Sequence, residues 1–253
     1  MSEEIIATQT SNLKPQHSIE VGVLTRGKPT LGMALLSMIT QETPGVRIHI
    51  VDTGETAVVR RDDVGAALRL AFDRGVQCSY ERTHQAKRNF SAGRLTLLQN
   101  LTGPHIVLMD DDIVMPGLAF QRIRNYIAAH PTYGYYAPYC LNIATPKAAF
   151  EELGENHYSP GGVIHQDARV RAALLDYYSH SLDVLDAGGG VKTWDIAFLS
   201  ALFPAMGRSA VVDRNHIVYH MDYQERPNWN LVQDNLIHAS MRRAQELAAK
   251  YED

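Results

Sequence analysis

The chain of 253 residues has the composition of a globular protein, with 45% hydrophobic and 21% charged residues, which excludes disordered and fibrous classes. Its formal net charge of −4 argues against a protein that binds polyanions over its whole surface. The first 17 residues lack the apolar core of a secretory signal, and no apolar run reaches the about 18 residues that a membrane span needs. Cys78 and Cys140 have no metal-ligand spacing and are expected to be buried reduced thiols, which favours a cytoplasmic location.

Strands and helices are predicted to alternate through the first half. Residues 19–24 read IEVGVL, a β-branched run typical of a strand, and residues 31–41 carry apolar side chains at helical spacing behind Thr30. The alternation continues with strands near 47–51, 76–81 and 105–109, and helices near 64–73 and 86–100, before Pro116 opens a further helix. This order predicts parallel strands, right-handed crossovers and helices on both faces of the sheet.

The rhythm changes after residue 132. The pattern there predicts a strand at 133–141, a loop at 156–166, a glycine turn at 188–190, a helix at 194–206, strands near 210–213 and 217–220, and a helix at 231–250. Because no linker composition marks a boundary, we expect one domain over residues 1–253.

Three consecutive aspartates, Asp110 to Asp112, follow the apolar run at 105–109. They repel one another unless a cation is near, and alternation along an extended chain directs Asp110 and Asp112 to one side and Asp111 to the other. Such a pair suits Mg²⁺ or Mn²⁺, although a solvated turn or a helix N-cap cluster would also fit. Thr25-Arg26, Asp52-Thr53 and the aspartates all follow carboxyl ends of predicted strands, so they should converge on one rim of the sheet.

Five further residues are candidates for chemistry, each with an ordinary alternative. Lys87 and Arg88 at the start of a helix could meet a pyrophosphate or a nucleobase, or could belong to a solvated helix face. Asp195, shortly after the glycines, could deprotonate a hydroxyl group, could cap the following helix, or both. In a strand, His216 and His220 lie about 13 Å apart and cannot share one metal; His220, which ends the apolar run, is the preferred single ligand, and a structural histidine is the alternative.

Taken in order, four segments resemble the nucleotide-sugar transferases of the GT-A fold, especially the large family 2. They are residues 21–26 (VGVLTR), 48–54 (IHIVDTG), 87–93 (KRNFSAG) and 106–112 (IVLMDDD). The resemblance covers about the first half of the chain and is specific as an ordered set. It implies an α/β, Rossmann-like GT-A fold with a mostly parallel sheet between helices and a smaller mixed acceptor-side region. Residues 18–132 would bind the nucleotide sugar, residues 133–230 would form the acceptor side, and residues 231–253 would form a C-terminal helix.

The resemblance also implies roles for individual residues. The nucleotide sugar would be bound by Thr25, Arg26, Asp52, Lys87, Arg88, Asp110, Asp111, Gly189 and Gly190. The metal would be held by Asp110, Asp112 and His220, and Asp195 would be the catalytic acidic residue of the acceptor region. Two departures from the family pattern leave the donor nucleotide and the base open, because the first loop lacks the usual Asn-Arg ending and the common Glu-Asp pair is Trp194-Asp195 here.

The expected activity is therefore transfer of a sugar from a UDP- or GDP-linked donor to an acceptor hydroxyl, with Mn²⁺ or Mg²⁺ as cofactor. The acceptor would be a small molecule or a glycan, and a nucleic-acid acceptor stays open. The alternatives are a sugar-nucleotide nucleotidyltransferase, which would release pyrophosphate, and a non-catalytic nucleotide- or carbohydrate-binding module. Asp195 is the candidate base if the reaction inverts the anomeric centre, and shapes the pocket if it retains it.

Overall fold

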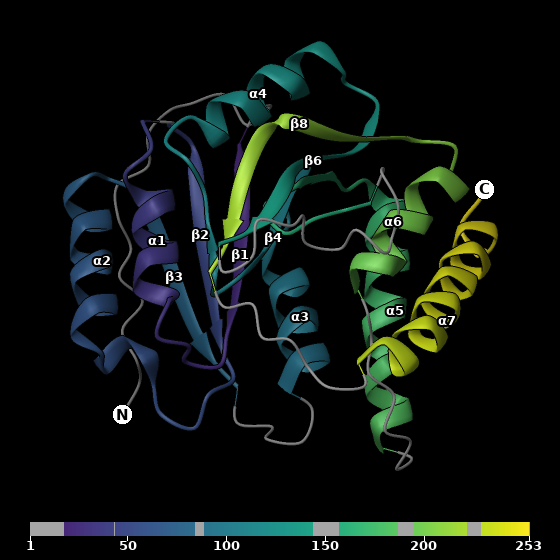
Figure 1. Cartoon of the computed structure of the whole chain (residues 1–253), viewed down its shortest axis with the longest axis horizontal. Coiled ribbons are helices and arrows are strands. Elements are labelled where there is room, and N and C mark those ends of the chain that lie inside the picture. Colours follow the sequence, from purple (N-terminus) through teal and green to yellow (C-terminus); the bar gives the residue numbers. More distant parts are fainter. Residues whose placement is uncertain are drawn as a thin grey trace.

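One mixed sheet of eight strands runs through the described part of the protein (Figure 1). The computed structural model describes residues 18–42, 44–83, 89–143, 157–186, 195–221 and 229–252. The strands are β1 (Ile19–Thr25), β2 (Val46–Asp52), β3 (Gln77–Arg82), β4 (His105–Asp110), β5 (Ile113–Val114), β6 (Tyr133–Asn142), β7 (Val163–His165) and β8 (Ser209–His220). They lie in the order β3-β2-β1-β4-β7-β6-β8-β5. The pairs β3–β2, β2–β1, β1–β4 and β6–β8 are parallel, while β7 and β5 run antiparallel to their neighbours.

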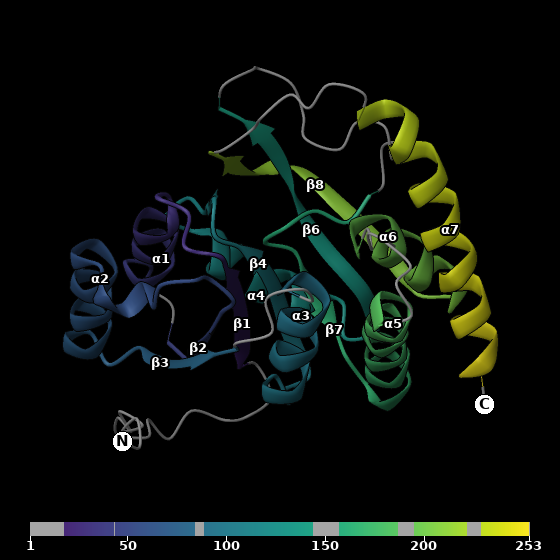
Figure 2. The same cartoon turned by 90° about the horizontal axis from the view of Figure 1, so that it is seen from below.

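Helices cover both faces of this sheet, as the sequence predicts (Figures 1 and 2). They are α1 (Leu31–Ile39), α2 (Asp62–Asp73), α3 (Asn89–Asn100), α4 (Ala119–Ala129), α5 (Ala168–Asp186), α6 (Asp195–Ala205) and α7 (Trp229–Lys250), with a short 3₁₀ turn at Val58–Arg60. Apolar residues of α1, α2 and α4 form one core against the sheet. Residues of α3, α5, α6 and α7 form a second core on the opposite face. None of the helices in the described ranges is both long and apolar enough to cross a membrane.

The central strand β1 shows why the layers form. All seven of its residues are buried, since a strand covered by helices on both faces reads as a continuous apolar run. Val21 and Val23 belong to the core under α1 and α2, whereas Leu24 belongs to the core under α3. At Gly22 an added Cβ would lie 2.8 Å from Leu101 Cδ1, so the glycine is what allows the end of α3 to pack closely on the strand.

Several elements differ from the sequence predictions. The loop expected at 156–166 contains strand β7, and the short strand β5 was not predicted. The two strands expected near 210–213 and 217–220 are one continuous strand, β8, whose register against β6 shifts between Pro138, which pairs with Asp213, and Tyr139, which pairs with Ile217. Residues 214–216 form this irregularity, and they lie between the two strands that the sequence predicted. Helix α5, by contrast, was not predicted, because polar residues interrupt its apolar positions.

The strand order also fixes where a ligand would bind. Strand β1 has β2 on one side and β4 on the other, and all three strands run parallel. Their carboxyl ends therefore lie along one edge of the sheet, and open α/β sheets bind ligands beyond that edge.

Candidate active site

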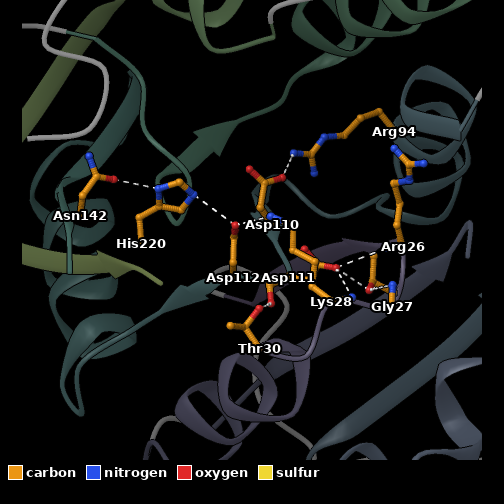
Figure 3. A network of polar contacts seen from close by, with 11 residues as sticks. Arg26, Gly27, Lys28, Thr30, Arg94, Asp110, Asp111, Asp112, Asn142 and His220 are labelled. Atoms are coloured by element: carbon orange, nitrogen blue, oxygen red, sulfur yellow. Dashed lines mark hydrogen bonds and ion pairs between the residues drawn. The ribbon is translucent and has the colours of Figure 1, made fainter. Parts of the chain in front are cut away.

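Three polar loops meet at this carboxyl edge. In the parallel register Thr25 lies opposite Asp52, and Leu24 lies opposite Asp110, so β1, β2 and β4 end at one level. The rim that the sequence predicted from strand ends is therefore present. Each aspartate of the triplet, however, has its own set of partners (Figure 3).

Asp111 holds the loop that follows β1. Its Oδ2 accepts hydrogen bonds from Thr25 Oγ1 at 2.6 Å, from the backbone nitrogen of Arg26 at 3.3 Å and from that of Lys28 at 3.4 Å. Thr30 Oγ1 donates to its backbone carbonyl at 3.0 Å. Burial raises the pKa of Asp111, and the hydrogen bond from Thr25 opposes this shift. The side chain points away from those of Asp110 and Asp112, as the alternation predicted, and is engaged in shaping the loop.

Asp112 lies against His220, the last residue of strand β8 near the far end of the sheet. Strand β8 pairs with β5 so that His220 lies opposite Ile113, and the Asp112 Oδ2 to His220 Nε2 distance is 3.2 Å. Lys28 Nζ lies 2.6 Å from the same oxygen. Burial alone would raise the pKa of Asp112, but the hydrogen bonds and charges of His220 and Lys28 outweigh it and lower the pKa.

His220 is also oriented from behind. Its Nδ1 lies 2.8 Å from Asn142 Oδ1, an atom that only accepts hydrogen bonds, so Nδ1 carries a proton and donates it. Nε2 is then the nitrogen that faces Asp112. A metal-binding histidine is commonly held this way, with the second ring nitrogen bonded to an oxygen that fixes the ring.

The donor atoms of Asp112 and His220 fit a hard divalent cation. Adjacent ligands of one octahedral ion with metal–ligand distances near 2.1 Å lie about 3 Å apart, which matches the oxygen–nitrogen separation of this pair. Asp110 does not complete a preformed triad with them, and the described residues contain no group of three or more His, Cys, Asp or Glu side chains poised around one ion. The pair therefore offers two ligands, and water or substrate oxygens would supply the rest.

Asp110 turns instead toward a buried arginine. Arg94 Nη2 lies 2.6 Å from Asp110 Oδ1, Arg94 Nε lies 3.1 Å from Asp195 Oδ2, and Tyr178 OH donates to that same Asp195 oxygen at 3.3 Å. Loss of hydration raises the pKa of Asp110 to about 6; the charge of Arg94 opposes the shift, and the neighbouring carboxylates add to it. Arg94 thus connects the end of β4 to the first residue of α6.

Of the remaining predicted residues, Asp52 and Arg26 lie in the part of the chain that the structure describes. Asp52 is fully buried, and its carboxylate accepts hydrogen bonds from the backbone nitrogens of Gly54 and Val58 and from Tyr80 OH, at 2.8, 2.9 and 2.8 Å, so that it organises the loop after β2. Arg26 is exposed on the rim. The predicted ligand residues Lys87, Arg88, Gly189 and Gly190 lie outside the described residues.

Sequence reasoning missed three functional candidates, Lys28, Arg94 and Asn142. A signal existed for Arg94, which is the one charged residue in a helix that otherwise buries Ala92, Leu97 and Leu98. Lys28 was visible in the loop Thr-Arg-Gly-Lys-Pro but had no assigned partner. Asn142 has no such signal, because its role depends on the pairing of β6 with β8.

Comparison with known proteins identifies the fold. No protein-family profile and no curated protein sequence matches the chain. Among solved structures it is similar to S. aureus TarS (TM-score 0.59, 11% identity, 92% of this chain and 42% of TarS) and to residues 1–349 of S. aureus TarS in complex with UDP-GlcNAc (TM-score 0.58, 11% identity, 92% and 71%). It is also similar to the mannosyltransferase PcManGT from Pyrobaculum calidifontis in complex with GDP-Man and Mn²⁺ (TM-score 0.53, 14% identity, 94% and 75%). The chain thus spans less than half of that TarS chain.

These likenesses confirm the GT-A fold predicted from the ordered segments of the first half. At 11–14% identity they are likenesses of fold. The reaction, its donor and its cation have to be argued from the chain's own residues.

Proposed function

We propose that this protein is a glycosyltransferase that moves a sugar from a nucleoside-diphosphate donor to an acceptor hydroxyl with the help of a divalent cation. The observation that carries the proposal is the Asp112–His220 pair, which lies at the carboxyl edge of a GT-A sheet and is oriented from behind by Asn142. The related folds have been solved with UDP-GlcNAc and with GDP-Man and Mn²⁺, which supports donors of this kind.

Asp112 and His220 would hold the cation, with Asp110 facing either the cation or the ribose. Bound there, Mn²⁺ or Mg²⁺ would neutralise negative charge on the departing nucleoside diphosphate. Lys28, whose ammonium now neutralises Asp112, would exchange that contact for the diphosphate. Thr25 and Arg26, in the loop that Asp111 shapes, would line the nucleoside side of the crevice.

Asp195 would act on the acceptor side. Its Oδ2 is held by Arg94 and Tyr178, while Oδ1 makes no hydrogen bond to any residue that the structure describes. In an inverting reaction Oδ1 would accept the proton of the acceptor hydroxyl as that oxygen attacks the anomeric carbon. In a retaining reaction Asp195 would shape the pocket, and the anomeric configuration of the product, read by NMR, decides between the two.

The test begins with binding. Thermal unfolding is measured with UDP, GDP and their sugar conjugates, with and without Mn²⁺, because a ligand at 100 times its Kd adds about 2.7 kcal/mol to the free energy of unfolding. Active combinations are then assayed for transfer to a panel of hydroxyl acceptors. We expect a Mn²⁺-dependent shift with one nucleotide and release of nucleoside diphosphate on turnover. Release of pyrophosphate would identify a nucleotidyltransferase, and binding without turnover on any acceptor would identify a binding module.

Asp112→Asn keeps the size of the side chain and removes its charge. We expect this variant to remain folded, to lose the Mn²⁺-dependent part of the thermal shift and to lose donor hydrolysis and transfer. Asp73→Asn is the matched control, since Asp73 is an exposed carboxylate at the end of α2. Normal turnover by Asp112→Asn would overturn the metal role of this aspartate.

A further inference from the structure

Arg94 is a buried side chain that links the carboxylates of Asp110 and Asp195. It is 2% exposed, and each nitrogen of its guanidinium group has a partner: Nη2 contacts Asp110, Nε contacts Asp195 and Nη1 donates to the Met109 carbonyl at 3.3 Å. In the proposed function, Asp110 lies on the donor side of the site and Asp195 on the acceptor side. One rigid group therefore joins a residue from each half of the chain.

The surroundings keep this group from moving. The guanidinium lies over the ring of Phe90, with its central carbon 5.2 Å from the ring centroid. A planar fork with donors in fixed directions can hold two carboxylates at a defined separation and angle, which a lysine ammonium cannot do. The relative placement of Asp110 and Asp195 is thus set by the geometry of Arg94 itself.

The contacts of Asp195 are also unequal in a way that suits a base. Arg94 Nε and Tyr178 OH both donate to Oδ2, at 3.1 and 3.3 Å. If Asp195 only balanced the buried charge of Arg94, hydrogen bonds to both of its carboxylate oxygens would serve equally well. Here Arg94 and Tyr178 hold one oxygen, and the other makes no hydrogen bond to the residues in the described ranges.

We propose that Arg94 is a positioning residue that sets the base Asp195 against the donor carboxylate Asp110, and this rests on the proposed function with inversion at the anomeric centre. When the acceptor oxygen bonds to the anomeric carbon, its proton passes to Asp195 Oδ1. The bond from the anomeric carbon to the diphosphate oxygen breaks, and its electron pair leaves with the diphosphate. Arg94 touches neither the acceptor nor the donor in this step. It acts by holding the base where the proton is released.

The test is Arg94→Lys, which keeps the positive charge and loses the fork. A displacement of about 1 Å in a reacting group costs on the order of 100-fold in rate. We expect kcat to fall about 100-fold, while the donor KM and the affinity for the nucleoside diphosphate change less than about threefold. Arg243→Lys is the matched control, because Arg243 also joins two carboxylates, Asp176 and Glu246, on the outer helices α5 and α7.

A double-mutant cycle with Asp195→Asn separates positioning from general support of the fold. If Arg94 works through Asp195, then Arg94→Lys lowers kcat less than about threefold once the base has been removed. Losses that multiply, or a donor affinity that falls as much as kcat, would show a structural role and overturn the inference. If Arg94→Lys does not fold, Phe90→Ala is read in its place: freeing the guanidinium should lower kcat several-fold at unchanged donor KM, and an unchanged kcat would overturn the inference.

Failure of the inference and failure of the function give different results. If the wild-type protein transfers no sugar from any nucleotide donor, the proposed function is wrong. If the wild-type protein transfers sugar and Arg94→Lys does so at the same rate, the function stands and the positioning role is wrong.

Discussion

Gly93 lies where helix α3 crosses the ends of β1 and β2, and replacing it with alanine tests whether this close approach builds the site. A Cβ at this position would lie 2.2 Å from Leu24 Cδ1 and 3.1 Å from Thr53 Cγ2. Both neighbours are buried, so Leu24 must leave its rotamer or α3 must move outward. Overpacking of this kind costs about 1–3 kcal/mol. Alanine in a helix interior recovers about 1 kcal/mol relative to glycine.

Gly65→Ala in α2 separates the cost of overpacking from the gain in helix propensity. Its added Cβ would meet nothing closer than 3.4 Å, so this variant should keep the gain in helix propensity and be about 0.5–1 kcal/mol more stable than wild type. In urea unfolding we expect Gly93→Ala to be about 1–3 kcal/mol less stable than Gly65→Ala, at a similar m-value. Equal stabilities within about 0.5 kcal/mol would refute the packing argument.

A second-site change checks the cause. Leu24→Val removes the Cδ1 atom that the new methyl group would strike, so combining it with Gly93→Ala should cost less than the sum of the two single changes. Because Arg94 follows Gly93 directly, an outward shift of α3 would also displace the guanidinium from Asp110 and Asp195. We therefore expect kcat to fall in Gly93→Ala and to recover partly in the double variant, and additive losses would contradict a clash with Leu24.

Three further predictions concern buried polar groups. Burial, followed by the charge of Arg122, lowers the pKa of His216 to about 4, so the folded protein keeps it neutral while the unfolded chain protonates it near pH 6.5. The free energy of unfolding should therefore fall as the pH drops from about 6.5 to 4, by up to roughly 3 kcal/mol, in urea titrations, and His216→Gln should remove much of this slope. Tyr80→Phe removes a donor to Asp52 and should cost about 1 kcal/mol in the same assay; no loss would show that the two backbone donors suffice. Thr25→Val leaves Asp111 without its shortest hydrogen bond and should cost about 1–3 kcal/mol while weakening nucleotide binding measured by calorimetry, whereas unchanged binding would separate the loop from the nucleotide.

The sequence was sufficient to predict which side chains share one rim, because the rule for alternating strands and helices needs only their order along the chain. Alternating strands and helices imply parallel strands, and parallel strands bring their carboxyl ends to one edge. The positions of Thr25, Asp52 and Asp110 follow from that rule without any knowledge of side-chain contacts. The second half of the chain follows no comparable rule. There, short antiparallel β7 and the unpredicted helix α5 interrupt the alternation.

The preference for His220 over His216 shows what a sequence pattern can establish and what it cannot. Strand spacing correctly separated His216 from His220: the first lies 3.1 Å from Tyr136 OH and the second lies against Asp112. The spacing could not supply the partner, because His220 meets Asp112 only through the pairing of β8 with β5. The register shift at residues 214–216 sets which residues at the end of β8 lie opposite β5.

The electrostatics of the aspartate triplet also depend on contacts that the sequence alone does not show. Three adjacent carboxylates repel one another, and a sequence pattern alone suggests one shared cation as the remedy. The fold gives each carboxylate a different positive or donating partner: Arg94 for Asp110, the loop nitrogens for Asp111, and Lys28 with His220 for Asp112. Arg94 is 16 residues from Asp110 and 101 residues from Asp195, so only the folded chain could show that the proposed base and the proposed donor carboxylate share one counter-charge. That sharing makes the separation of donor and acceptor groups a property of one side chain, and for this reason the Arg94→Lys and Asp195→Asn cycle is informative about the reaction.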